Sequence, residues 1–216
     1  MRTGRVAALC CMGLALSARA DKARVPRPAL PAVKYAFHET HEHERVTIAA
    51  EPGDTVETQP NTRLDYSHHG LLTMRVIITN DSDEALNLDE ARILFIAADN
   101  TVVQAATDDE LQRRMFAMKS VQGTKIPLPA PLPSITIHHP PVDKQILRDD
   151  DDFGFKSTTV APHTTASGYL YYDVKELDEP VLEKATLEVR RVKTASGKTL
   201  DSFEIALKPS DKDARK

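Results

Sequence analysis

An alternating run between positions 72 and 79 places the strongest constraint on the fold. Leu72, Met74, Val76 and Ile78 alternate with Thr73, Arg75, Ile77 and Thr79. Successive side chains of a β-strand point to opposite faces, so this period of two predicts a strand with one continuous apolar face. The polar residues 80–83 follow directly and favour a turn. This strand needs a partner layer that covers its apolar face.

Further short runs of apolar and β-branched residues follow the same plan. We expect strands at 46–48, 91–98, 101–103, 168–174, 186–192 and 203–207, and a hairpin turn at 195–198. The run at 91–98 is nearly all apolar, which is typical of a strand buried on both faces. The chain is therefore expected to be built mainly from strands.

One helix is predicted among these strands. Thr107 and Glu110 form a capping-box pattern, and Leu111, Met115 and Met118 follow at helical spacing. The methionines are interpreted as core residues, since methionine fills irregular gaps in apolar interiors.

Residues 119–152 differ from the rest of the chain. Prolines at every second position between 127 and 133 predict an extended, polyproline-like conformation. We interpret the whole segment as a crossover loop between two sheets, and a loop of this length is functional or mobile. The predicted fold class is all-β: an immunoglobulin-like antiparallel β-sandwich with one short helix and a long Pro-rich crossover loop. A β-barrel is the alternative.

The first twenty residues predict export. Arg2 and Arg5 precede an apolar run from Val6 to Leu16, and Ala18-Arg19-Ala20 has the small-x-small pattern of a signal-peptide cleavage site. An uncleaved anchor and a lipoprotein acylated at Cys10 or Cys11 are the alternatives. Both cysteines lie in this segment, so the cleaved chain would have no disulfide and no thiolate ligand.

The expected organisation follows from these segments. It comprises a signal peptide at 1–20, a Pro-rich disordered leader at 21–34, a β-sandwich domain at 35–208 and a disordered charged tail at 209–216. The formal charge of −4 offers no basic excess for nucleic acid. We expect a periplasmic or extracellular protein without a transmembrane segment in its mature chain.

Two stretches carry a resemblance to known proteins. They run from Val76 to Leu88 and from Val160 to Val174. They resemble secreted immunoglobulin-like domains of bacterial envelope proteins, which pair a strand and an Asn-Asp turn with a later aromatic strand that ends in Asp-Val. With His41–Ala49, Arg113-Arg114 and Phe203–Leu207, the likeness extends to a family of whole secreted bacterial proteins of unknown function, over residues 35–208. The resemblance implies fold and export, and it brings no catalytic residue.

The histidines are the strongest candidates for functional residues, as ligands of a metal ion. His38, His41 and His43 stand among three glutamates within seven residues. In an extended chain His41 and His43 would face the same side and could bind Zn²⁺ or Cu²⁺, with His68 and His69, or the pair at 138–139, completing the site. The pattern His-Glu-x-His is one residue shorter than the zinc-protease motif. A polar, solvated strand edge is the alternative interpretation.

The sequence gives less support to a calcium site or a hydrolase site. The acidic run 149–152 could bind Ca²⁺, but it lacks the alternate ligand spacing of a calcium loop, and a solvated acidic loop is the simpler interpretation. Ser167-Gly168 lacks the first glycine of a Gly-x-Ser-x-Gly motif, although a hydrolase site could still assemble in space. We therefore expect a non-catalytic envelope domain that binds an envelope protein or another envelope component through a sheet edge or the 119–152 loop. A zinc- or copper-binding protein is the alternative.

Overall fold

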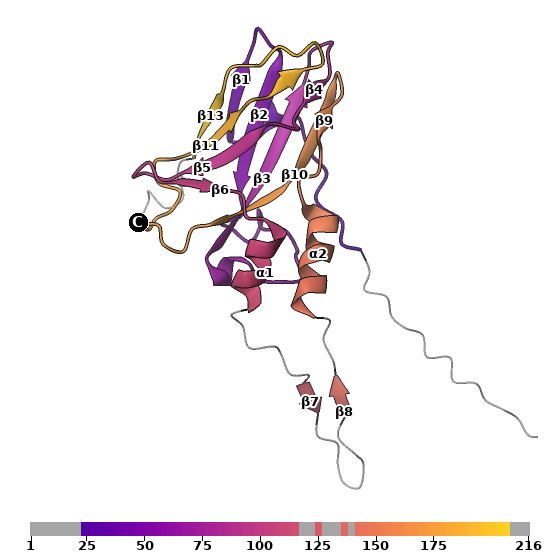
Figure 1. Ribbon diagram of the computed structural model, residues 1–216, viewed down its shortest axis with the longest axis vertical. Helices are drawn as coiled ribbons and strands as arrows, with labels where there is room; N and C mark the ends of the chain where they lie inside the picture. Colours follow the sequence, from indigo (N-terminus) through magenta and orange to yellow (C-terminus); the bar gives the residue numbers. More distant parts are fainter. Residues whose placement is uncertain (1–22, 117–123, 127–134, 138–140, 208–216) are drawn as a thin grey trace, which may run out of the picture.

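Antiparallel strands make up most of the structure, as the alternating runs predict. The structure is a computed structural model, and it describes residues 23–116, 124–126, 135–137 and 141–207. Two four-stranded sheets face each other, and two short α-helices lie together at one end of them (Figure 1). The predicted signal peptide at 1–20, the Pro-rich run 127–134 and the predicted tail at 209–216 lie outside the described residues.

The first sheet has the strand order β1-β2-β3-β10 and the second has the order β13-β11-β5-β6. The strands of the first sheet are β1 (Phe37–His41), β2 (Val46–Pro52), β3 (Leu71–Asn80) and β10 (Thr164–Asp173). The strands of the second sheet are β5 (Arg92–Ile96), β6 (Val102–Gln104), β11 (Ala185–Arg190) and β13 (Phe203–Leu207).

Smaller elements complete the fold. A third sheet has the order β12-β4-β9, and β7 pairs with β8 in a hairpin. Their bounds are β4 (Leu86–Asn87), β7 (Thr124–Ile126), β8 (Ile135–Ile137), β9 (Thr159–Val160) and β12 (Lys193–Thr194). The helices are η1 (Ala32–Lys34), η2 (Ser67–His69), α1 (Asp108–Phe116) and α2 (Val142–Phe153), where η marks a 3-10 helix.

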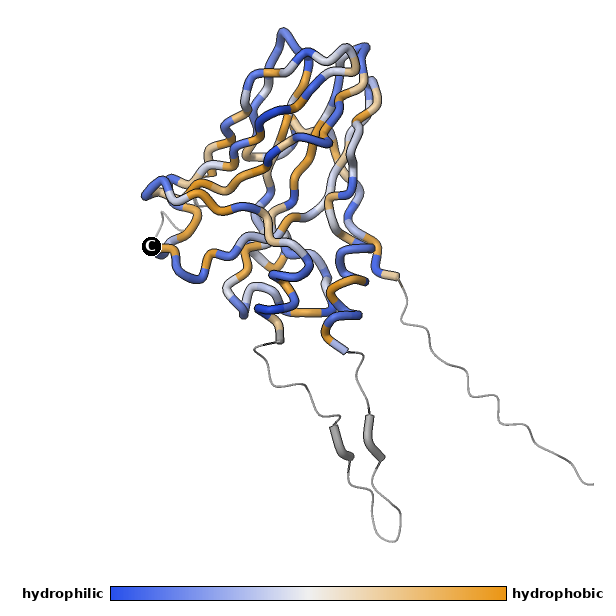
Figure 2. The backbone as a smooth tube through the Cα atoms, viewed as in Figure 1, coloured by the Kyte–Doolittle hydropathy of each residue, from blue (hydrophilic) through white to orange (hydrophobic). Residues whose placement is uncertain are grey.

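The two large sheets share one hydrophobic core. Met74, Val76 and Ile78 of β3 are buried in it, which confirms the predicted apolar face. Phe95 and Leu187 contribute from the second sheet. Figure 2 shows the apolar residues along the strands, while the loops far from the helices are hydrophilic. The alternation of β3 thus determines which side of the first sheet faces the second.

The two sheets also meet along both of their edges. At one edge β1 lies against β13. At the other edge the chain leaves β6 and joins β10 by an antiparallel bridge between Ala105 and Tyr172. Ala106 then donates its N–H to the carbonyl of Tyr171 at 2.7 Å. Closure of this kind removes unpaired strand edges, which otherwise promote aggregation.

The structure differs from the expected disordered leader at 21–34, because residues 23–34 pack on the first sheet. Residues 23–34, which we call the N-terminal strap, lie on the outer face of the first sheet. Ala32 is 0% exposed and donates its N–H to the Thr79 hydroxyl at 2.8 Å. The buried Arg75 donates to the carbonyl of Arg27 at 2.5 Å. The composition of the strap suggested disorder, but its carbonyl and amide groups satisfy polar side chains of β3.

The predicted helix is confirmed. In α1 the N–H of Thr107 donates to Glu110 Oε2 at 2.8 Å, and the N–H of Glu110 lies 3.4 Å from the Thr107 hydroxyl. Leu111 and Met115 are buried, as their spacing predicts. Thr107 and Glu110 therefore form the reciprocal cap that fixes the start of the helix.

The prediction of a single helix and of an extended segment over 119–152 is wrong for residues 142–153. These residues form α2, in which Ile146 and Phe153 are buried and Val142 packs beside Ile146. Their spacing of four and seven residues places them on one face of a helix.

No helix among the described residues is long and apolar enough to cross a membrane.

Gly168 gives a first testable prediction. The chain after α2 passes so close to β10 that a Cβ at position 168 would lie 2.3 Å from Phe155 Cα. Phe155 is held there because its N–H donates to Tyr169 C=O at 3.1 Å. Gly168→Ala should therefore lower the free energy of unfolding by about 1–3 kcal/mol in urea denaturation. The exposed substitution Thr159→Ala should stay within about 0.5 kcal/mol, and equal effects would contradict this account.

Candidate functional site

The predicted histidine cluster lies along β1 and the turn that follows it. His41 stacks on Phe203 with 3.8 Å between ring centroids, and its Nε2 lies 3.3 Å from Glu39 Oε1. His38 Nδ1 lies 2.8 Å from the carbonyl of Tyr35. Since successive residues of a strand face opposite sides, His38 and His41, which are three positions apart, direct their imidazoles to opposite faces.

The two parts of the proposed metal site lie at opposite ends of the first sheet. His41 pairs with Val46, which in turn pairs with Asn80 at the end of β3. His68 and His69 lie in η2, directly before the start of β3. A strand of ten residues spans about 30 Å at 3.3 Å per residue. The structure therefore does not bring these two groups of histidines together.

The remaining histidines do not change this arrangement. His43 is exposed in the turn between β1 and β2, and the pair at 138–139 lies outside the described residues. His163 is exposed, and its Nε2 lies 3.1 Å from Asp83 Oδ1. Within the part of the chain that the structure describes, no group of three or more His, Cys, Asp or Glu side chains is arranged to hold a metal ion.

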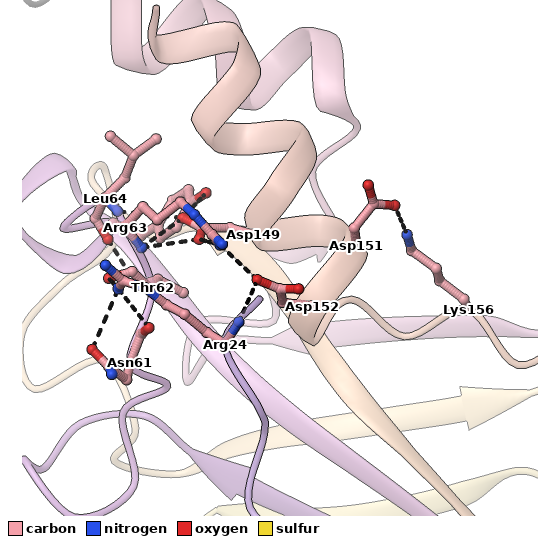
Figure 3. A network of polar contacts seen from close by, with 10 residues as sticks. Arg24, Asn61, Thr62, Arg63, Leu64, Asp149, Asp151, Asp152 and Lys156 are labelled. Atoms are coloured by element: carbon pink, nitrogen blue, oxygen red, sulfur yellow. Dashed lines mark hydrogen bonds and ion pairs between the residues drawn. The ribbon is translucent and has the colours of Figure 1, made fainter. Parts of the chain in front are cut away.

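The acidic run 149–152 is not the solvated loop that the sequence suggests. It belongs to α2, and its first residue is buried. Asp149 is 0% exposed because it shares the inner face of the helix with Ile146 and Phe153. Its carboxylate accepts the N–H of Arg63 at 2.9 Å, the N–H of Leu64 at 3.3 Å and the Tyr66 hydroxyl at 3.2 Å (Figure 3).

Arg63 links this carboxylate to a second one. Its Nη1 lies 2.9 Å from Asp149 Oδ1 and 2.7 Å from Asp152 Oδ2. The N–H of Arg24, in the N-terminal strap, donates to the same Asp152 oxygen at 3.0 Å (Figure 3). We name Arg24, Arg63, Tyr66, Asp149 and Asp152 the α2 anchor. The anchor joins the helix, the strap and the loop before η2, so its polar groups serve structure.

Acidification should weaken the α2 anchor. The N–H of Arg24, and after it the side chain of Arg63, hold the pKa of Asp152 below its usual value. The folded-state pKa is thus lower than the unfolded one, so this stabilisation is present above the unfolded pKa and is lost as the pH falls through the folded value. From about pH 4 downward, Asp152→Asn should lose less stability than the native chain in denaturant titrations. Parallel losses in both proteins would contradict this expectation.

The best candidate for a binding site is a hollow of about 1030 Å³ where the sheets meet the helices. Its lining comes from β6, η2, α1 and the end of β10 with the residues that follow it. We call it the β6 groove. Gly70 ends η2 in the left-handed conformation with φ of 74°, and this turn brings the chain against Lys175 in the groove wall.

One wall of the groove is an open strand edge. Ala97 donates its N–H to the carbonyl of Thr101, so the next hydrogen-bonded pair of this antiparallel ladder is at Val103. Val102 and Gln104 therefore turn their N–H and C=O groups away from β5. Gln104 lies opposite Asp173 where the chain joins β10, so the open main-chain groups of this edge are those of Val102. Val102 also exposes 54% of its surface. The open edge is short, because the chain closes onto β10 immediately afterwards.

Some of the charged side chains that line the groove have hydrogen-bond or ion-pair partners, and others have no ion pair among the residues that the structure describes. Glu110 is occupied by the cap of α1, where the N–H of Thr107, and after it the Thr107 hydroxyl, lower its pKa. Asp173 accepts from Arg114. Arg113 and Lys175 are exposed, and neither forms an ion pair within the described parts of the chain. The unmatched charge of the groove is therefore positive.

Local sequence patterns did not identify this groove. Arg113 and Arg114 enter the sequence analysis only through the resemblance, and nothing in the sequence singles out Val102 or Lys175. The groove arises because β6, η2, α1 and the end of β10 converge in space, although they are distant in sequence. No protein-family model, curated protein or solved structure matches the chain.

Proposed function

We propose that this protein is an exported, non-catalytic interaction module of immunoglobulin-like sandwich type. It acts in the periplasm or outside the cell and binds an extended segment of an envelope protein in the β6 groove. The observation that carries this proposal is the open edge at Val102, which lines a hollow large enough for a peptide. An extended peptide that adds a strand to such an edge gains main-chain hydrogen bonds and a fixed register.

Two further features support the proposal. The first twenty residues have the pattern of a signal peptide, which fits a role in the envelope. Elsewhere the edge strands of the two large sheets lie against each other: β1 lies against β13, and the chain after β6 pairs with β10. The open main-chain groups of Val102 thus differ from the other edges of the large sheets, which are closed.

The test selects short random peptides by display against the mature chain. Val102→Pro removes the N–H that points into the groove but leaves the hydrogen bonds between β6 and β5 in place. Enriched peptides should bind the proline variant at least about tenfold more weakly than the native chain. The matched control Val102→Thr should bind like the native chain, because it keeps the N–H.

A second measurement locates the binding. Bound peptide should slow amide hydrogen exchange at Val102, and circular dichroism should show that Val102→Pro is folded. Failure to enrich any peptide would overturn the proposal. So would peptides that bind the proline variant as well as they bind the native chain.

A further inference from the structure

We infer that the segment accepted by the β6 groove is acidic, with carboxylates that alternate with apolar side chains. This inference rests on the proposed function and specifies its partner. The open edge at Val102 offers few main-chain hydrogen bonds, and each contributes only about 1 kcal/mol in water. Side-chain contacts must therefore supply much of the affinity and the selectivity.

The cations of the groove are placed for this purpose. Lys175 lies on one wall, after the end of β10, and Arg113 lies on another, in α1. Both are exposed and lack an ion-pair partner among the described residues, whereas the two carboxylates of the groove are engaged by Thr107 and Arg114. The groove lining holds three cations and two carboxylates, and Glu110 keeps its charge because its partners in the cap are neutral. An incoming carboxylate would therefore meet a net positive charge.

The local charge also contrasts with that of the whole protein. The chain has a formal charge of −4, so its surface as a whole disfavours an acidic partner. A positive groove in a negatively charged protein directs such a partner to one place, and this steering weakens with added salt. Val102, which is exposed beside these cations, offers the apolar contact for the alternate residues of the segment.

The experiment uses three synthetic probes: a peptide of alternating Glu and Val, its Gln–Val counterpart and a Lys–Val peptide. Fluorescence anisotropy with the mature chain should show that the Glu–Val peptide binds at least about tenfold more tightly than the Gln–Val peptide. Raising the salt concentration should reduce this preference. The double variant Arg113→Gln/Lys175→Gln should abolish it. The matched control Lys34→Gln/Arg92→Gln changes two exposed cations outside the groove and should keep it.

The outcomes separate the two proposals. If the Glu–Val and Gln–Val peptides bind equally well and both are lost in Val102→Pro, the groove binds segments but the charge inference is overturned. A preference that survives in Arg113→Gln/Lys175→Gln also overturns it. If no probe binds and display enriches no peptide, both proposals fall. Concentration-dependent dimers that Val102→Pro abolishes would show a second copy of the chain as the occupant and would overturn the inference.

Discussion

Replacing Asp149 by Ala should lower the free energy of unfolding by about 3–5 kcal/mol, because the substitution removes the fully buried carboxylate that pairs with the Arg63 guanidinium. The Arg63 side chain is 5% exposed and bonds to Asp149 and Asp152. Removing the first carboxylate also leaves the N–H groups of Arg63 and Leu64 and the Tyr66 hydroxyl without their acceptor. An unsatisfied buried polar group costs about 1–3 kcal/mol. The measurement is urea denaturation followed by circular dichroism.

A paired variant identifies the cause of this loss. Arg63→Met/Asp149→Leu removes both buried charges and should be more stable than Asp149→Ala, since apolar residues of similar volume often replace buried ion pairs without loss. Hydrogen exchange should show that Asp149→Ala loosens α2 and residues 61–66 before the sheets. A loss below about 1 kcal/mol in Asp149→Ala would mean that the α2 anchor does not hold the helix.

Ile78→Asp should prevent the chain from folding. Ile78 is 0% exposed in the core shared by the two sheets, and it pairs with Ile48 on β2 and Ala166 on β10. A carboxylate there would be buried without a partner, which costs several kcal/mol, and the lost apolar contacts add to that cost. Such a sum is comparable to the whole stability of a typical domain, about 5–15 kcal/mol.

The measurement is the thermal transition of purified Ile78→Asp, which should be absent. Val102→Asp serves as the control, because position 102 is exposed on β6, and it should keep a transition close to that of the native chain. Ile78→Val should cost only about 0.5–1.5 kcal/mol. A cooperative transition in Ile78→Asp near the native temperature would place this side chain outside the core.

The sequence predicted those features that are encoded over a few consecutive residues. The alternation at 72–79 predicts β3 and its inner face, and the cap at Thr107 and Glu110 predicts the start of α1. These signals are local, because side-chain direction in a strand and capping at a helix start depend on near neighbours. The predicted strands and this helix therefore agree with the structure.

Helix α2 was missed although the spacing of Val142, Ile146 and Phe153 is a local signal, but the other missed features depend on contacts between distant segments. The run 149–152 suggested repulsion and solvation, but Asp149 is buried because Arg63, 86 positions away, supplies its partner. The prolines of the N-terminal strap suggested disorder, but β3 offers Arg75 and Thr79 to its main chain. The β6 groove has no local signal, since its walls come from four separate segments. Composition and periodicity carry no information about such pairings.

The closure of the large sheets also bears on how copies of this protein behave at high concentration. Exposed strand edges allow molecules to exchange strands and associate, and here β1 with β13 and β6 with β10 shield most of those edges. The open edge that remains at Val102 lies in the same groove as Arg113 and Lys175. Two copies that approached each other through this edge would bring like charges together. The cations that favour an acidic partner therefore also oppose self-association.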